Sequence, residues 1–284
     1  MTANSSDKNA LLAQLAWQQA MGINEVLLDD PGAGMTVSMR DLRDLRGSRD
    51  LPDSRDLPMP AKMPAAKLDA SPAEQVSVGQ RPTASPGGTA LLTEALAGLT
   101  TIETLRQALE GLDQCALKHT ASNMVFADGN PGSRVMVVGD VPGREEDRVG
   151  LPMVGAAGQL FDRMLASINL SRAQTYVTCL LPWRPPGNRT PTPEEMEMLL
   201  PWLYRHIQLA APDFIFILGG VTAKALIPVT GGILKTRGRW FDIDYGDGII
   251  RPTLATLHPS YLIRSPAQKR LAFADLLALA AKLE

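Results

Sequence analysis

Short apolar runs alternate with amphipathic stretches along the chain after about residue 90. Five runs have the length and β-branched content of strands, and they lie at residues 134–139, 175–181, 214–219, 240–245 and 252–257. Four stretches have apolar positions at helical spacing, and they lie at residues 156–168, 193–211, 221–227 and 266–283. The run at 240–245 is short and predicts an edge strand. This alternation predicts an α/β fold, in which helices cover both faces of a central, mainly parallel sheet.

The chain before residue 90 follows a different pattern. Residues 8–28 have apolar positions at helical spacing and predict an amphipathic helix within an N-terminal segment, 1–29. Residues 30–90 have no periodicity: Arg-Asp-Leu occurs four times, and Pro, Ser and Gly then dominate. Such composition is typical of a disordered, low-complexity linker. We therefore expect the folded domain to span residues 91–284, and residues 89–111 to form one or two helices.

Composition and charge limit the classes of function. The 284 residues carry a formal net charge of -2, so any binding to nucleic acid must depend on a local basic patch. Cys115 and Cys179 have neither the spacing of metal ligands nor that of a disulfide framework. The N-terminus lacks the pattern of a signal peptide, and no apolar run has the length of a membrane span. We expect a cytoplasmic, monomeric protein.

Three unusual loops follow predicted parallel strands. Gly-Asp-Val-Pro-Gly occupies 139–143 after the first strand, Trp-Arg-Pro-Pro-Gly-Asn-Arg occupies 183–189 after the second, and His-Pro-Ser-Tyr-Leu-Ile-Arg occupies 258–264 after the last. The carboxyl ends of parallel strands share one rim of the sheet, where open α/β folds bind ligands. The loops therefore predict a cleft that contains an acid, an imidazole and three arginines.

Each residue of this cleft also has a structural interpretation. Asp140 can cap a turn, and His258 can be an ordinary hydrogen-bonded turn histidine. Arg184 and Arg189 are harder to explain in this way, because the nearby prolines fix the backbone and present guanidinium groups that suit phosphates. The three loops together favour a functional site over any of these separate explanations.

Residues 112–284 resemble the family 4 uracil-DNA glycosylases of the wider uracil-DNA glycosylase superfamily. The matching segments are 125–131, 139–147, 155–160 with 162–165, 184–190, 237–240 and 258–264. The resemblance implies an enzyme that flips deoxyuridine out of DNA and hydrolyses its glycosidic bond through an oxocarbenium-like state, for base excision repair.

The resemblance also implies roles for individual residues. Asp140 would position the catalytic water, and His258 would stabilise the uracil anion. Gly139 and Val141 would offer backbone groups to the base, which Glu146 and Met153 would enclose. The residues expected to handle DNA are Arg184, Asn188, Arg189, Tyr261 and Arg264.

Three positions depart from the family pattern. The family glutamate is Asp140, which is one methylene shorter, and the family phenylalanine that stacks on uracil is Met153. The asparagine that reads the base edge is Cys179, which offers only a weak donor. These changes leave two alternatives open: a weakened or inactive protein that binds DNA or a protein partner, and a glycosylase for another deaminated base.

The family carries a four-iron four-sulfur cluster on four cysteines, and the resemblance places these at Leu112, Cys115, Trp183 and Leu199. Only Cys115 keeps a thiol, as a vestigial ligand, and such clusters need thiolate ligation. We therefore expect no cluster and no other cofactor, with apolar side chains in the cluster's volume. The expected partner is uracil-containing DNA, single- or double-stranded. A protein partner for the N-terminal helix or the linker stays open.

Overall fold

The computed structural model describes residue 92, residues 95–229 and residues 231–284. These residues belong to one of the two units into which the chain divides. The predicted N-terminal helix and the predicted linker lie outside the described residues, so both stay predictions. Within the described ranges, no helix is long and apolar enough to cross a bilayer.

A six-stranded sheet forms the centre of the domain, with the strand order β1-β3-β2-β4-β6-β5. The strands are β1 (Ala127–Gly129), β2 (Val135–Gly139), β3 (Thr175–Cys179), β4 (Phe214–Leu218), β5 (Trp240–Asp244) and β6 (Ile250–Thr256). The four inner strands pair in parallel, whereas β1 and β5 pair antiparallel at the two edges. The predicted fold class is confirmed, and the short run at 240–245 is an edge strand, β5.

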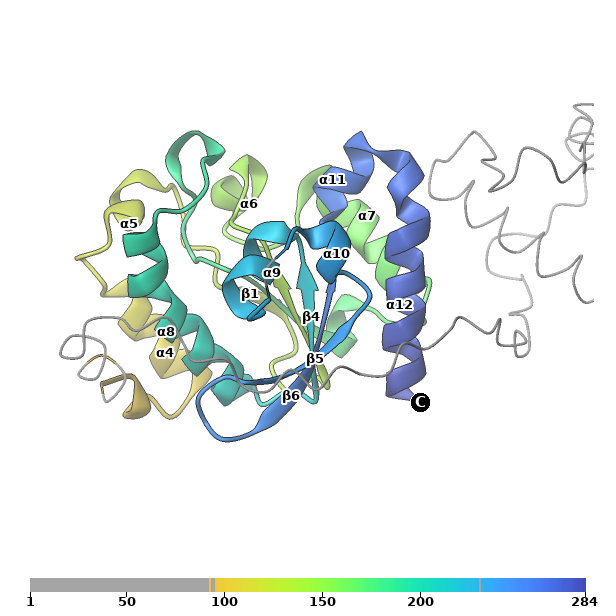
Figure 1. Cartoon of the computed structure of the whole chain (residues 1–284). Coiled ribbons are helices and arrows are strands. Elements are labelled where there is room, and N and C mark those ends of the chain that lie inside the picture. Colours follow the sequence, from red (N-terminus) through yellow and green to blue (C-terminus); the bar gives the residue numbers. More distant parts are fainter. Residues whose placement is uncertain (1–91, 93–94, 230) are drawn as a thin grey trace, which may run out of the picture. The chain divides into compact units, whose positions relative to one another are not determined.

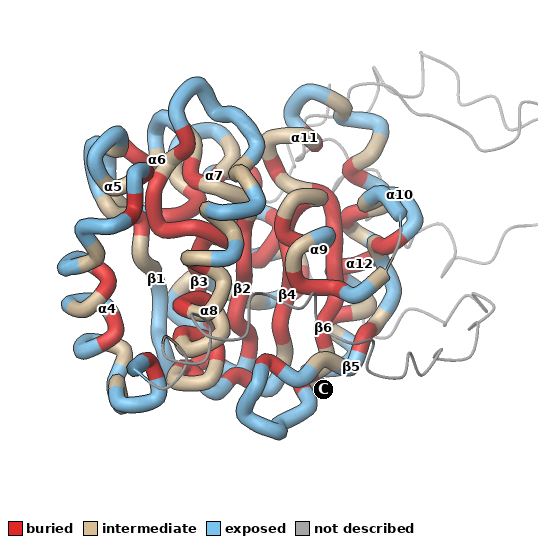
Figure 2. Tube along the Cα trace, turned by 60° about the vertical axis from the view of Figure 1, so that its left-hand side comes forward, coloured by how far each residue is buried: buried red, intermediate tan, exposed pale blue. Residues whose placement is uncertain are grey.

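Most residues of the inner strands are buried because helices cover both faces of the sheet. All five residues of β2 and of β3 are buried, as the red strands of Figure 2 show. Helices α4 (Ile102–Glu110), α8 (Pro193–Ala210) and α9 (Gly220–Leu226) lie on one side of the sheet in Figure 1. Helices α7 (Gly155–Ala166) and α12 (Lys269–Leu283) lie on the other.

Alternate residues of the strands enter the two helical layers. Met136 and Val138 of β2, with Ile215 and Ile217 of β4, join the apolar cluster that includes α4, α8 and α9. On the opposite face, the buried Thr256 of β6 donates a hydrogen bond of 2.5 Å to Asp275 on α12. This alternation follows from the two-residue period of a strand.

Short elements at the ends of the strands were not predicted as separate elements. They are α5 (Ala116–Thr120), α6 (Arg144–Val149), α10 (Ile233–Thr236), α11 (Pro259–Arg264) and the 3-10 turns Arg172–Gln174, Pro186–Asn188 and Pro266–Gln268. Strand β1 was also missed. Helices α6 and α11 follow the carboxyl ends of β2 and β6, where they shape the candidate site.

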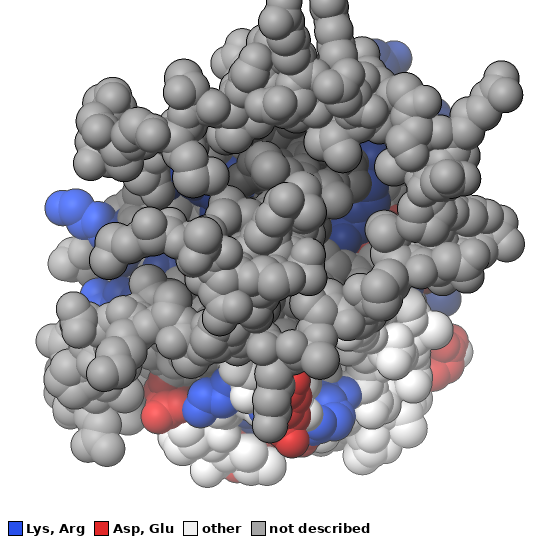
Figure 3. Space-filling model, turned by 90° about the vertical axis from the view of Figure 1, so that its right-hand side faces the viewer, with Lys and Arg blue, Asp and Glu red and all other residues white. Residues whose placement is uncertain are grey.

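The direction in which the chain adds successive strands to the sheet reverses between β2 and β4. The chain leaves β2 through α7 to reach β3, and leaves β4 through α9 and α10 towards β6, on the other side. The carboxyl ends of β2 and β4 therefore form a topological switch point, where open α/β sheets place their ligands. Acidic and basic side chains lie side by side along the lower edge of the face shown in Figure 3.

Candidate active site

Asp140 lies at the switch point, immediately after β2. Its Oδ1 accepts hydrogen bonds from the backbone N–H of Thr222, at 2.9 Å, and from the Thr222 hydroxyl, at 3.0 Å. Its Oδ2 lies so close to Gly219 that a Cβ added there would be 2.1 Å away. The carboxylate therefore rests against the first turn of α9, between the ends of β2 and β4, and it leaves room for no side chain at position 219.

His258 lies after β6 and begins α11. Its Nδ1 accepts from the backbone N–H of Ser260, at 3.2 Å, and lies 2.8 Å from the Ser260 hydroxyl. An accepting Nδ1 places the hydrogen of the neutral imidazole on Nε2. Burial lowers the pKa of His258, although the nearby carboxylates of Asp140 and Glu146 act in the opposite direction. The site thus holds a neutral imidazole whose Nε2–H can stabilise a developing negative charge.

Cys179 ends β3 and pairs in register with Gly139, the last residue of β2. Its thiol is buried, and burial raises its pKa, with further contributions from Glu146 and Asp140. The thiol is therefore protonated and offers one weak donor. Asp140, Cys179 and His258 come from three different strands and interact electrostatically, so the structure brings the predicted residues together at one rim.

Met153 forms a wall over the end of β2. A Cβ added to Gly139 would lie 2.6 Å from the methyl carbon of Met153, so the thioether covers Gly139 directly. Met153 is buried and has a φ of 51°, in the left-handed region that a residue with a side chain rarely adopts. Its position therefore depends on contacts that hold the backbone in this conformation.

Arg172 supplies those contacts. Its guanidinium donates to the backbone carbonyls of Met153 and Pro152, the latter at 3.2 Å. The same group donates to Asp128 at 2.8 Å and to Asp162 at 2.6 Å, which fixes its orientation. Arg172 thus connects β1 and α7 to the loop that carries Met153.

Glu146 holds the other end of this loop. One carboxylate oxygen accepts from the backbone N–H of Gly143, at 3.1 Å, and the other accepts from the backbone N–H of Val154, at 3.1 Å. Both contacts are to backbone, so Glu146 joins the start of α6 to the segment beside Met153. Val141, between β2 and α6, is half-buried against the apolar core.

The predicted DNA-binding residues of the second loop make contacts within the protein. Arg184 donates to Asn188 at 2.7 Å and lies 3.8 Å from the buried carboxylate of Asp147. Arg189 makes two hydrogen bonds to Glu195, of 2.8 and 2.5 Å, and Glu195 also closes the capping box of α8. Contact between Arg189 and a phosphate therefore competes with an existing ion pair.

Helix α11 and helix α10 present apolar side chains near the site. Tyr261 is half-buried on α11, whereas Arg264 and Ile263 are exposed. On α10, Leu234 is 60% exposed, and the preceding Ile233 would lie 3.5 Å from a Cβ at Gly220. Because Gly220 follows Gly219, α10 lies against the same turn of α9 that holds Asp140.

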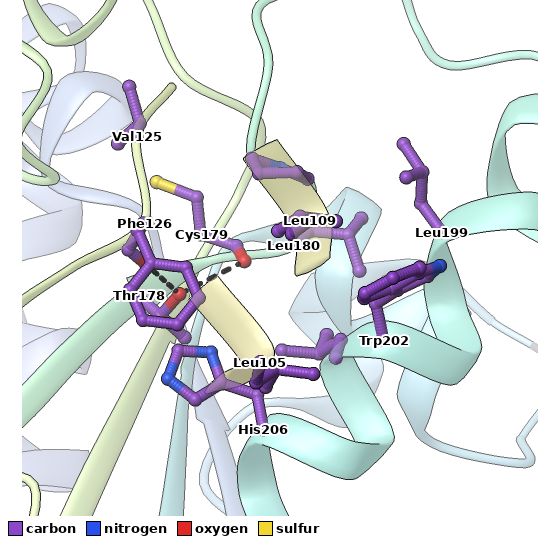
Figure 4. Close-up of a pocket in the computed structure, with 12 residues that line it drawn as sticks. Leu105, Leu109, Val125, Phe126, Thr178, Cys179, Leu180, Leu199, Trp202 and His206 are labelled. Carbon is purple, nitrogen blue, oxygen red and sulfur yellow. Dashed lines mark hydrogen bonds between the residues drawn. The ribbon is translucent and has the colours of Figure 1, made fainter. Parts of the chain in front are cut away.

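A separate hollow lies between β3 and helices α4 and α8. Its cavity volume is about 20 Å³, which is room for about one water molecule. In Figure 4 the ring of Phe126 lies over His206, and the sulfur of Cys179 points towards Val125. The centroids of the Phe126 and His206 rings are 4.4 Å apart. Neither Asp140 nor His258 lines this hollow, so it is distinct from the candidate site, and Cys179 borders both.

The four positions expected to hold the family's cluster do not fit one. Cys115, Trp183 and Leu199 are buried in the same apolar cluster, and Leu112 packs against it. They offer one thiol where four thiolates are needed. In the described part of the chain, no group of three or more His, Cys, Asp and Glu side chains is placed to hold a metal ion.

Two residues of the site were not identified from the sequence. Thr222 holds the acid, and Arg172 holds the wall. The Gly-Gly pair after the apolar run of β4 was a usable signal for Thr222, since β4 is a parallel strand that ends at the same rim. Arg172 lies in an unremarkable polar stretch, so its role depends on tertiary contacts alone.

Comparison with known proteins agrees with this geometry. Residues 126–279 match the model of the uracil DNA glycosylase superfamily. The chain is 35% identical to a type-4 uracil-DNA glycosylase of Pyrobaculum aerophilum over 169 residues, covering 58% of this chain and 86% of that protein. It is 36% identical to one from Archaeoglobus fulgidus, covering 54% and 78%, and 34% identical to one from Thermotoga maritima, covering 58% and 84%.

Proposed function

Because this chain belongs to the type-4 branch of the uracil-DNA glycosylase superfamily, we propose that it hydrolyses the N-glycosidic bond of a flipped deoxyuridine in DNA. The observation that carries the proposal is the meeting of an acid and a neutral imidazole donor at the switch point of the sheet. An enzyme of this class must remove the base from the stack, since the reacting carbon is unreachable within a duplex.

The two groups suit the two charges that develop as the bond breaks. The sugar acquires oxocarbenium character, which the carboxylate of Asp140 stabilises while it orients the attacking water. The base leaves as an anion, and the Nε2–H of His258 donates to it. A neutral imidazole serves this purpose because it is already a donor at neutral pH, and burial keeps it neutral.

Met153, Cys179 and Glu146 define the space around the base. Met153 covers the end of β2, and Cys179 replaces a side chain that can both donate and accept with one that donates weakly. We propose that discrimination among deaminated bases is weaker here than in a site with a matched amide, because buried polar pairing is what rejects wrong substrates.

DNA binding rests on α11, α10 and the loop after β3. Arg264 carries an exposed cation, while Ile263 and Leu234 are apolar groups able to contact the gap left by a flipped nucleotide. We assign the strongest phosphate contact to Arg264, since Arg189 and Arg184 already have protein partners. The protein is proposed to act in the cytoplasm, as a monomer and without an iron–sulfur cluster.

Single-turnover excision on a single-stranded oligonucleotide that contains one uracil tests the proposal, because this substrate avoids most of the flipping cost. We expect excision that falls by about 100-fold in Asp140→Asn and in His258→Gln, the size of a lost charge-stabilising contact. The matched control is His119→Gln, which changes an exposed imidazole on α5.

Substrate range and reversion complete the test. Cys179→Asn restores the family residue, and we expect it to increase uracil excision and to sharpen selectivity against hypoxanthine and xanthine. Excision of hypoxanthine or xanthine in place of uracil would identify a glycosylase for another base. Absence of excision from all three substrates would overturn the proposal and leave a DNA-binding scaffold.

A further inference from the structure

The hydroxyl of Thr222 is the feature of the site that the proposed function leaves unexplained. Thr222 is fully buried on α9, and its hydroxyl contacts two groups at the end of β2. The hydroxyl lies 2.8 Å from the carbonyl oxygen of Gly139 and 3.0 Å from Oδ1 of Asp140. A hydroxyl has one hydrogen, so it donates fully to only one of these acceptors at a time.

The carbonyl oxygen of Gly139 does not depend on the Thr222 hydroxyl for a hydrogen bond. The carbonyl of Gly139 also accepts from the backbone N–H of Leu180, at 2.9 Å, so it keeps a partner when the hydroxyl turns to Asp140. The backbone N–H of Thr222 donates to the same carboxylate oxygen in both arrangements. Asp140 therefore always has one donor, and the hydroxyl supplies a second when the carboxylate is charged.

We propose that Thr222 is a positioning residue that holds the charged Asp140 carboxylate against the first turn of α9, where it is needed for glycosidic bond hydrolysis. The inference rests on the proposed function, because it assigns the geometry of the acid in that reaction. Thr222 acts through Asp140 and does not itself touch the reacting atoms.

The arrangement also explains why a short acid occupies position 140. Oδ2 of Asp140 already lies in contact with Gly219, and Oδ1 takes both donors of Thr222. A glutamate has one more methylene, so its carboxylate cannot occupy this place without displacing the turn. Asp140 and Thr222 therefore form a matched pair, and Asp140→Glu alone is expected to lower the rate of excision.

The test compares two substitutions that differ in a hydroxyl. Thr222→Val keeps the shape of the side chain, and we expect kcat for uracil excision to fall by about 10- to 100-fold with little change in KM, as for a lost hydrogen bond to a charged group. Thr222→Ser restores the hydroxyl and is expected to stay within about threefold of the parent chain. The control is Thr253→Val, which removes the hydroxyl of another fully buried threonine, one bonded to the backbone carbonyl of Arg251 and to the hydroxyl of Tyr245.

Rescue by serine separates positioning from general destabilisation. Thr222→Ser restores the hydroxyl but not the volume of the side chain, so it would not rescue a role that depends on packing alone. Equal rates for Thr222→Val and the parent chain would overturn the inference, as would equal losses in the Ser and Val variants.

A second readout does not need excision. The carboxyl carbon of Asp140 can be followed by NMR in protein labelled with ¹³C-aspartate and assigned with Asp140→Asn. Its chemical shift at neutral pH should change in Thr222→Val and return in Thr222→Ser. A parent chain that excises no uracil but shows this pattern would refute the proposed function and retain the contact. An unchanged chemical shift in Thr222→Val would refute the role of Thr222 itself.

Discussion

His206 allows a quantitative test of how the core beneath the site depends on pH. It is buried on α8, and its Nε2 lies 2.8 Å from the hydroxyl of Tyr176. Burial lowers its pKa to about 3. The imidazole of an unfolded chain has a pKa of about 6.5. As the pH falls below about 6.5, the unfolded state therefore takes up a proton that the folded state does not, and the folded state loses stability.

The magnitude follows from the two pKa values. Between pH 7 and pH 4.5, His206 should reduce the free energy of unfolding by about 2.5 kcal/mol. A folded-state pKa of about 4 in place of about 3 changes this figure by only about 0.1 kcal/mol, because the imidazole stays mostly neutral at pH 4.5 in either case. The expected effect therefore does not depend on the depth of the pKa shift.

The assay is denaturant unfolding of the parent chain and His206→Gln at several pH values. Glutamine cannot titrate, so the difference in unfolding free energy between the two proteins should change by about 2.5 kcal/mol over this interval, in favour of the variant at low pH. A difference that stays constant with pH would refute the argument. A similar slope in His119→Gln, at the exposed histidine of α5, would show that burial is not its cause.

Three further predictions concern the surface, the missing cluster and the wall of the site. Arg264→Gln should weaken DNA binding and reduce the salt dependence of the binding constant by about one counterion, whereas Arg189→Gln should have a smaller effect because its guanidinium is bonded to Glu195; equal effects in a salt titration would contradict the assignment. Protein purified under anaerobic conditions should contain no stoichiometric iron or sulfide, and visible absorption of a cluster would disprove this. Arg172→Met should lower excision by about tenfold or more, since Met153 loses the contacts that hold its left-handed backbone; an unchanged rate would mean that the wall does not depend on this arginine.

The sequence predicted an element correctly where one physical cause, such as burial or a helix cap, determines a whole run of residues. The buried strands β2 and β4 are continuous apolar runs, and the long helix α8 begins at a threonine cap and a proline. Strand β1 has only three residues and no apolar run, because it is defined by pairing with β3. Such an element has no local signature, since its hydrogen bonds come from residues far away in the chain.

The site was predictable in its residues but not in its contacts. The loops after β2 and β6 indicated Asp140 and His258 as site residues, because the carboxyl ends of parallel strands share one rim of the sheet. The acceptor role of His258 Nδ1 and the contact between Asp140 and Thr222 needed the turn of α9 and the start of α11 in place. The ion pair between Arg189 and Glu195 likewise depends on how the loop approaches α8, which residue types alone do not specify.

Because the backbone at Met153 is fixed, a change in the shape of this wall has to come from the side chain of Met153. Arg172 and Glu146 hold the segment on both sides, so the loop has little freedom to move as a unit. The thioether, in contrast, turns about three single bonds at small energetic cost. An aromatic ring at this position would form a slot of constant width, whereas a methionine forms one whose width follows its occupant. We therefore expect bases of different bulk to be accommodated through changes of the Met153 rotamer, with no movement of the main chain.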